Sequence, residues 1–267
     1  MSGGRGSLAW GRRIEQGAVW ACLIVLSVIF MIPFVITLGD SLKTFMQIYA
    51  VPRIWIPMPP QFRNFVDIFS VLPFLTFFKN TIFITALALS GQVISACLVG
   101  YSFARLRWPF RDTCFVLLLS TMMLPGQVTM IPIFLLFNYL GWVNTWLPII
   151  VPAWFAVNVF NVFLMRQFFK TIPYSLEEAA FIDGAGHLRI LTMIMLPLAK
   201  PALATVAVFT FIWTWNDYMG PLLYLNKDPR RWTVALGLAM FRTAMWQRTR
   251  WDLLMAASTM MIIPIIL

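Results

Sequence analysis

The feature of this sequence that most limits its fold is a series of apolar runs, each about as long as a membrane-spanning helix. They fall at 18–38, 81–104, 113–136, 145–165, 201–222 and 252–267. Every break between them is polar or rich in proline. A helix needs about 20 apolar residues to cross a hydrocarbon core about 30 Å thick. The sequence therefore predicts an all-α integral membrane protein with six spans, of which the first is a retained helix rather than a cleaved signal.

The composition supports this class of protein. Apolar residues make up 60% of the chain and charged residues 11%, whereas an average soluble domain has about 45–50% and 25%. The net charge is +10, but no soluble domain is available to present a basic face to nucleic acid. Arginines that contact anionic lipid beside the membrane explain the charge, so we expect no nucleic-acid partner. Cys22, Cys97 and Cys114 have no paired spacing and are expected to be free thiols.

The short connections predict the orientation of the chain. Segment 105–112 contains three arginines, whereas 137–144 has no charged residue. The positive-inside rule places 105–112 in the cytoplasm, and with it the N-terminus and loop 166–200. Segment 40–79 is then expected to be an ordered loop outside the cell.

Loop 166–200 contains local signals for a short helix. Pro173 ends the preceding helix, and Ser175 followed by Glu178 has the spacing of a capping box, so a helix should begin near Leu176. Ala179 and Ala180 have small side chains, which would let another surface come close.

The second half of the loop should turn and continue as another helix. Gly184 and Gly186 are expected to end the first helix in a left-handed turn. The second helix should place three apolar residues on one face, and prolines should break it before the fifth span: these are Leu188, Leu191 and Met195, then Pro197 and Pro201.

The residues of this loop carry a resemblance to a known family. Glu178-Ala179-Ala180, Asp183-Gly184-Ala185 and Leu196-Pro197 resemble the EAA loop of permease subunits in ATP-driven, binding-protein-dependent importers. In that family a separate ATPase moves the membrane helices through this loop. The resemblance implies the type I importer permease fold, with six transmembrane helices and a cytoplasmic coupling helix between the fourth and fifth. The alternative is a capped amphipathic connector without a partner.

Two other segments resemble the sugar-importing branch, especially the smaller permease subunit of maltose-type importers. One runs from Trp213 to Tyr218, followed by Pro221-Leu222 and Trp232-Thr233, and the other surrounds Lys43 and Trp55. The resemblance covers the chain from about residue 17 to 267. Relatives continue beyond the sixth helix into a cytoplasmic tail, whereas this sequence stops at Leu267 inside its last apolar run. We therefore expect that it lacks that tail.

The resemblance implies a non-catalytic permease subunit of an importer for a sugar, an oligosaccharide or a related polar solute. The partners it implies are a second, different permease, two ATPase subunits, an extracytoplasmic binding protein and lipid, in a bacterial or archaeal inner membrane. This chain would bind no metal and no cofactor, and the ATPase would use ATP and Mg. The sequence agrees in lacking a P-loop, because no glycine precedes a lysine.

The end of the fifth span contains candidates for the solute path, namely Trp213, Asn216 and Asp217. Amides and carboxylates bond sugar hydroxyls, and a carboxylate at this depth should be paired or face water. The favoured alternative is that Asn216 and Asp217 satisfy backbone groups where Gly220 and Pro221 break the helix.

Loop 223–250 is basic and carries Trp232 and Trp246. Arg230, Arg231 and Trp232 are candidates for contact with the binding protein, because tryptophan and arginine often anchor interfaces. The alternative is a belt of aromatic and basic residues that lies on lipid headgroups.

A membrane-embedded enzyme or assembly factor is the competing class of function. An enzyme should carry several ionisable groups at membrane depth, and in the spans we single out Asp217. The one histidine, His187, lies in loop 166–200 and is expected to be solvated or at an interface. A permease for peptides or inorganic ions would differ from the favoured hypothesis only in its solute.

Overall fold

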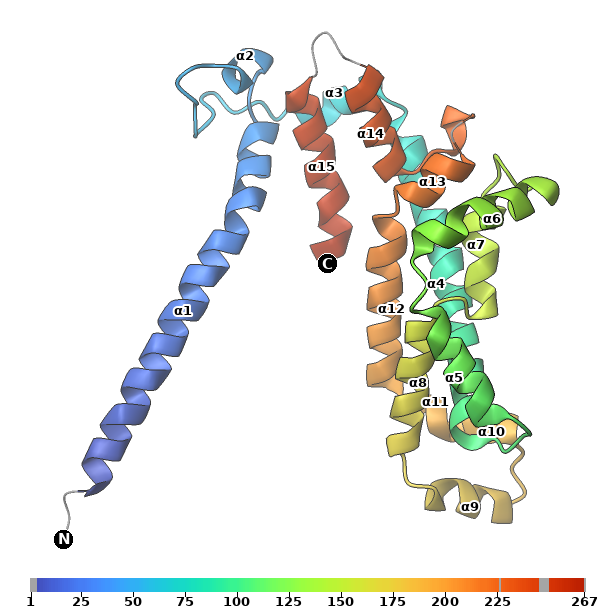
Figure 1. Cartoon of the computed structure of the whole chain (residues 1–267). Helices are drawn as coiled ribbons and strands as arrows, with labels where there is room; N and C mark the ends of the chain where they lie inside the picture. Colours follow the sequence, from blue (N-terminus) through green and yellow to red (C-terminus); the bar gives the residue numbers. More distant parts are fainter. Residues whose placement is uncertain (1–3, 226, 245–249, 267) are drawn as a thin grey trace. The chain divides into compact units, whose positions relative to one another are not determined.

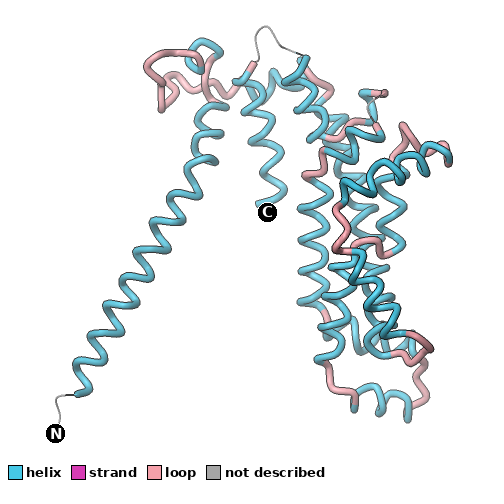
Figure 2. Tube along the Cα trace, in the orientation of Figure 1, coloured by secondary structure: helices cyan, strands magenta, loops and turns pink. Residues whose placement is uncertain are grey.

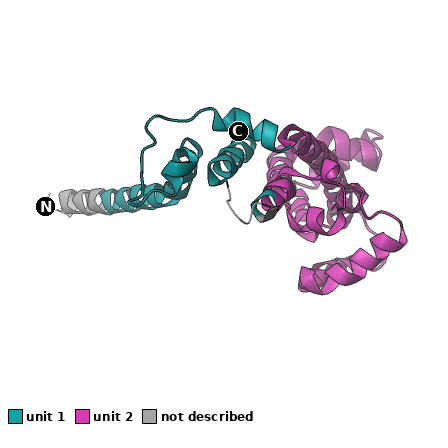
Figure 3. Cartoon of the chain, turned by 90° about the horizontal axis from the view of Figure 1, so that it is seen from above, with its two compact units in different colours: residues 1–72, 241–267 teal, residues 73–240 magenta. Residues whose placement is uncertain are grey.

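The computed structural model describes residues 4–225, 227–244 and 250–266, and the regular secondary structure of these residues is helical (Figures 1 and 2). This confirms the all-α class. The chain divides into two compact units, residues 1–72 with 241–267 and residues 73–240 (Figure 3). That the whole chain forms one permease domain stays a prediction. Trp246 lies outside the described residues.

The first unit contains α1 (Gly4–Ser41), α2 (Phe45–Ile48), α3 (Asn64–Val71) and α15 (Trp251–Ile266), and α15 contacts the other three. Side chains order the segment after α1, as expected for 40–79. Lys43 is buried and pairs with Asp40, and Arg53 bonds the other oxygen of that carboxylate at 2.9 Å. Asn64 donates to the carbonyls of Ser41 and Lys43, both at 2.8 Å.

The sixth predicted span begins with an ionisable residue that no sequence pattern singled out. Asp252 is 1% exposed and accepts a bond of 2.6 Å from Nη2 of Arg250. The pair lies at the start of α15, where an acidic side chain suits the positive end of the helix dipole.

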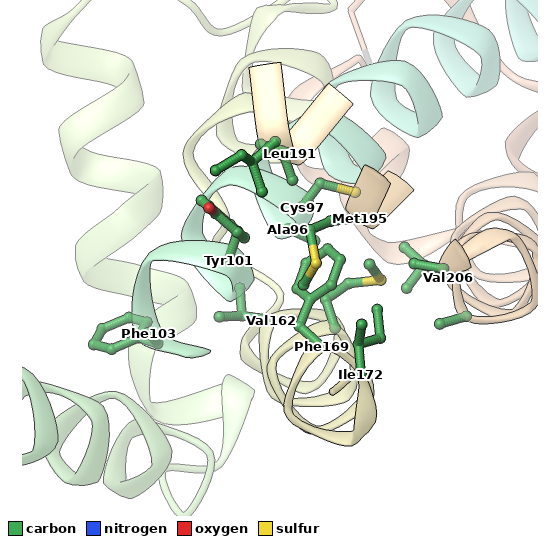
Figure 4. Close-up of a cluster of buried hydrophobic side chains, with 14 of the residues drawn as sticks. Ala96, Cys97, Tyr101, Phe103, Val162, Phe169, Ile172, Leu191, Met195 and Val206 are labelled. Atoms are coloured by element: carbon green, nitrogen blue, oxygen red, sulfur yellow. The ribbon is translucent and has the colours of Figure 1, made fainter. Parts of the chain in front are cut away.

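The centre of the second unit is formed by α4 (Phe74–Arg105), α8 (Val159–Thr171) and α12 (Lys200–Trp215). Their apolar side chains share one core, in which Cys97, Phe169 and Met195 lie close together (Figure 4). Gly100 permits the close approach of α4 and α8, because a Cβ atom there would lie 2.8 Å from that of Met165. The remaining elements are α5 (Arg111–Thr121), α6 (Gly126–Tyr139), α7 (Leu147–Ile150), η1 (Val151–Phe155), α9 (Ser175–Ile182), α10 (His187–Ile190), η2 (Leu191–Met195), α11 (Leu196–Leu198), α13 (Met219–Tyr224), η3 (Pro229–Arg231) and α14 (Val234–Ala244).

Three described helical segments are long and apolar enough to cross a membrane: Glu15–Ser41, Phe74–Arg105 and Leu147–Thr171. Two pairs of helices would qualify only as bent spans, α5 with α6 at 100° and His187–Leu198 with α12 at 81°. The described residues thus hold three candidate spans, or up to five with the bent pairs. The count of six stays a prediction.

Two of the predicted spans are not single helices. The run 113–136 is divided between α5 and α6 at Pro125, whose extended backbone (φ −60°, ψ 131°) and missing amide hydrogen interrupt the helix. The run 201–222 is divided after Trp215. There Asn216 donates its side-chain amide to the carbonyl of Ile212 at 2.8 Å, which satisfies a group that the end of α12 leaves free.

Candidate functional site

Helix α9 lies beyond α8 and α10 at one end of the second unit (Figure 1). It begins at Ser175, without the capping box that we predicted. A capping residue needs an extended backbone, but the chain is already helical at Tyr174 (φ −66°, ψ −26°). The Tyr174 carbonyl accepts the amides of Glu177 at 3.0 Å and Glu178 at 3.1 Å. The helix is therefore started by the turn after Pro173, and the Glu178 side chain has no capping role.

The two adjacent glutamates of α9 have opposite environments. Glu178 and Ala179 are exposed, whereas Glu177 is 1% exposed and Ala180 is 7% exposed. Residues three apart share a helix face, which explains why Glu177 is buried together with Ala180. We predicted a role for Glu178 and missed Glu177, although this spacing could have revealed it.

Arg105, the last residue of α4, faces Glu177. Its Nε lies 3.1 Å from Oε1 of Glu177, as an ion pair without the alignment of a hydrogen bond, and the side chains are 6% and 2% exposed. Nη2 of Arg105 donates to the carbonyl of Phe169 at 2.6 Å and to that of Ile172. Burial raises the pKa of Glu177, and the attraction of Arg105 and then His187 opposes this rise.

The other end of α9 is closed by a left-handed glycine, as predicted. Gly184 has φ +80°, and no atom would lie within 4 Å of a Cβ there. Its amide donates to the Phe181 carbonyl at 3.0 Å and that of Ala185 donates to Ala180 at 2.9 Å, the two bonds of a Schellman motif. Gly186 was predicted to share this role, but its backbone is extended (φ −79°, ψ 165°), because it precedes the next helix.

The second helical stretch of the loop runs through α10, the π-helical turn η2 and α11. Leu191 and Met195 lie in the core as predicted, whereas Leu188 is 69% exposed, so that the expected apolar face lacks its first residue. The His187 ring packs edge-on against Phe181, with 5.0 Å between the ring centroids. Leu196 is partly buried and Pro197 is exposed, just before the 81° bend into α12.

The predicted path residues lie together in a groove of about 900 Å³ between α8 and the end of α12. Its lining is polar and aromatic: Asn158, Phe160, Asn161, Phe209, Ile212, Trp213, Asn216, Asp217, Tyr218 and Met219. A neighbouring pocket of about 340 Å³ shares Asn158, Trp213 and Asp217 with it. Asn158 and Asn161 were missed, since single amides in an apolar run give no pattern. Asp217 is the one charged residue in the described lining of either pocket.

The structural alternative for this region also has a basis in the geometry. Oδ1 of Asp217 accepts the backbone amide of Gly220 at 3.0 Å, in the first turn of α13. The break in the helix lies at 216–218, before the position that we predicted from Gly220 and Pro221. Asp217 therefore both lines the groove and bonds the backbone.

The segment 228–232 is held against the second unit by bonds that no sequence pattern signalled. Asn80 of α4 donates to the carbonyl of Arg230 at 2.8 Å and to that of Trp232 at 3.0 Å. Arg231 donates to the carbonyl of Asn144 at 2.6 Å, and the Trp232 indole donates to that of Leu225 at 2.9 Å. Of the three predicted contact residues, Arg230 is exposed, while Arg231 and Trp232 are half-buried.

Comparisons with known proteins agree with this architecture. The diacetylchitobiose uptake system permease protein NgcG of Streptomyces coelicolor is 28% identical over 92% of this chain and 81% of its own length. The sn-glycerol-3-phosphate transport system permease protein UgpE of Yersinia enterocolitica is 33% identical over 82% and 79%.

A solved bacterial ABC transporter involved in the import of the acidic polysaccharide alginate matches 96% of this chain and 94% of its own, with 27% identity and a TM-score of 0.83. The family described as binding-protein-dependent transport system inner membrane component matches residues 92–267. The chain therefore belongs to this family of multi-pass inner-membrane transport proteins, as its EAA-like loop led us to expect.

Proposed function

We propose that this chain is one of two permease subunits of an ATP-binding-cassette importer, and that it forms part of the path of an uncharged saccharide. The observation that carries the proposal is α9, which is attached to the unit by one face and exposes Glu178 and Ala179 on the other. An ATPase subunit would contact the exposed face. In this proposal the chain is not catalytic and binds no cofactor, and the ATPase uses ATP and Mg.

The proposed ATPase contact extends from α9 to the glycine turn. Asp183 and Gly184 are exposed beside Glu178 and Ala179, and small side chains let a partner approach closely. Ala180, Ala185, Leu196 and Pro197 would shape this surface from within the loop. The surface belongs to the cytoplasmic side, as does the N-terminus, because the arginines of 105–112 precede α5 at the same end of the unit.

The composition of the groove supports an uncharged saccharide as the solute. Aromatic faces such as that of Trp213, which is 78% exposed, can stack on sugar rings, and the amides of Asn158 and Asn216 can bond hydroxyl groups. An anionic sugar would meet the Asp217 carboxylate without any cation in the described lining of the groove. Among the named relatives, the diacetylchitobiose permease fits this chemistry better than permeases named for anionic solutes.

The proposed partners include a binding protein outside the cell and a second, different permease that completes the path. Arg230 is the exposed residue at the tip of the segment 228–232, and it would contact the binding protein. Arg231 and Trp232 would support this contact through their bonds to Asn144 and Leu225.

Reconstitution tests the central proposal. The chain is placed in liposomes with its partner permease, the ATPase pair and the binding protein, and both uptake of solute and hydrolysis of ATP are measured. We expect uptake only with the complete set. Uptake by the two permeases without the ATPase would overturn the proposal.

A further inference from the structure

We propose that Arg105 is a positioning residue that joins α9 to α4 and α8, so that a displacement of α9 reaches the membrane helices through the Arg105–Glu177 pair. This inference rests on the proposed contact between α9 and an ATPase. It concerns the connection inside this chain rather than the surface that the ATPase touches.

One guanidinium group contacts three helices. Arg105 is the last residue of α4, and its Nη2 donates to the carbonyls of Phe169, in α8, and Ile172, just after it. Its Nε faces Glu177 of α9 at 3.1 Å, and its plane lies over the Tyr174 ring at 5.7 Å. Arginine suits this position because its planar fork directs several donors at fixed angles, which a lysine ammonium group does not.

Burial makes the pair difficult to separate. The side chains of Arg105 and Glu177 are 6% and 2% exposed. Removing one member of such a pair leaves a buried charge without compensation, which is far less favourable than losing an exposed pair. A movement of α9 away from α4 would likewise deprive each charge of its partner, so the two helices should move together.

The other attachments of α9 are weaker. Ala180 enters the core, but its methyl group buries little apolar area. At the C-terminal end the chain leaves through Gly184, which has no atoms within 4 Å of a Cβ position. The path from the exposed Glu178 to the membrane helices therefore runs through the neighbouring Glu177 and then Arg105.

The test uses the complete reconstituted importer and measures solute uptake per ATP hydrolysed. Glu177→Gln keeps the shape of the side chain and removes its charge, whereas Arg105→Lys keeps the charge and removes the fork. Arg107→Lys, at an exposed position two residues away, is the matched control. We expect each of the two pair variants to retain the ATPase subunits but to lose uptake per ATP by about fivefold or more, with the control unchanged.

The double variant separates a joint from two independent effects. If the two residues act through each other, Arg105→Lys with Glu177→Gln should lose no more than the worse single variant. Additive losses, unchanged uptake per ATP, or a general failure to assemble would each overturn the inference. A wild-type complex without ATP-dependent uptake would instead overturn the proposed function itself.

Discussion

The carboxylate of Asp217 fills the space where a side chain on residue 220 would lie. Oδ1 accepts the Gly220 amide at 3.0 Å, and a Cβ atom on that glycine would be only 2.4 Å from Oδ2. The same carboxylate lines the groove that we propose for the solute. The path and backbone roles that the sequence left as alternatives thus meet in one side chain.

Gly220→Ala should displace this carboxylate. The new methyl group forces Asp217 to rotate and to lose its bond to the backbone, at a cost of about 1 kcal/mol in the free energy of unfolding. Gly126→Ala is the control, since a Cβ there meets no atom within 4 Å. Thermal unfolding of the purified complex measures both variants, and equal midpoints would contradict the geometry.

Asp217→Asn and Asp217→Ala should separate the charge of this residue from its bond to the backbone. Asparagine keeps an oxygen that can accept the Gly220 amide, so the complex should be as stable as the wild type. Alanine loses that bond, and the complex should be less stable by about 1 kcal/mol. If both variants lose assembled complex equally and for every solute, Asp217 has only the structural role.

Gly184→Val should abolish coupled transport while membrane insertion persists. Valine at φ +80° costs about 1–2 kcal/mol or more, so the turn after α9 must distort. Gly186→Val is a matched control in the same loop, because its backbone is extended and a Cβ there meets no atom within 4 Å. Co-purification of the ATPase and solute uptake are the measurements. Normal coupled turnover in Gly184→Val would refute the role of this turn.

The groove should distinguish solutes by charge. We expect tetra-N-acetylchitotetraose to quench the fluorescence of Trp213 at a concentration at least about tenfold lower than tetragalacturonate, because the latter brings like charges to Asp217. The complex carrying Trp213→Phe supplies the background from other tryptophans. Asp217→Asn should narrow the difference between the two sugars. Equal quenching by both in the wild type would exclude an uncharged saccharide as the preferred solute.

Single cysteines near Arg230 should report the proposed contact with the binding protein. A cysteine in place of Arg230 is exposed at the tip of 228–232 and should crosslink to the binding protein during turnover. A cysteine in place of Asn80 is the comparison, since this residue is 7% exposed. Crosslinks from position 230 to lipid probes alone would favour the headgroup belt.

The sequence was most informative where a local rule acts alone. Apolarity identified the long helices, because lipid demands it along their whole length. The left-handed conformation of Gly184 was predicted correctly, because few other residues adopt it. The resemblance to a permease family was also confirmed by the match to residues 92–267.

The errors arose where distant segments decide the local outcome. The environment of Glu177 depends on Arg105, which is far away in the chain, and the placement of Arg230 and Trp232 depends on Asn80. Neither pairing leaves a mark in a single sequence. The capping box was wrong because the turn after Pro173 starts the helix before Ser175. The bend at Pro125 has a local signal, but the apolar run on both sides of it concealed the break.

The π-helical turn η2 has a consequence for insertions and deletions in the chain. A π-turn closes its bonds over one residue more than an α-turn does, so the stretch between Ile190 and Leu196 holds a surplus residue. Deleting one exposed residue there, such as Met193, would let the turn close as α-helix. It would also rotate Leu196 and Pro197 by about 100° around the helix axis relative to Ile190. The direction in which the chain enters α12 is therefore set by counting, and a single codon gained or lost in η2 changes it more than most substitutions could.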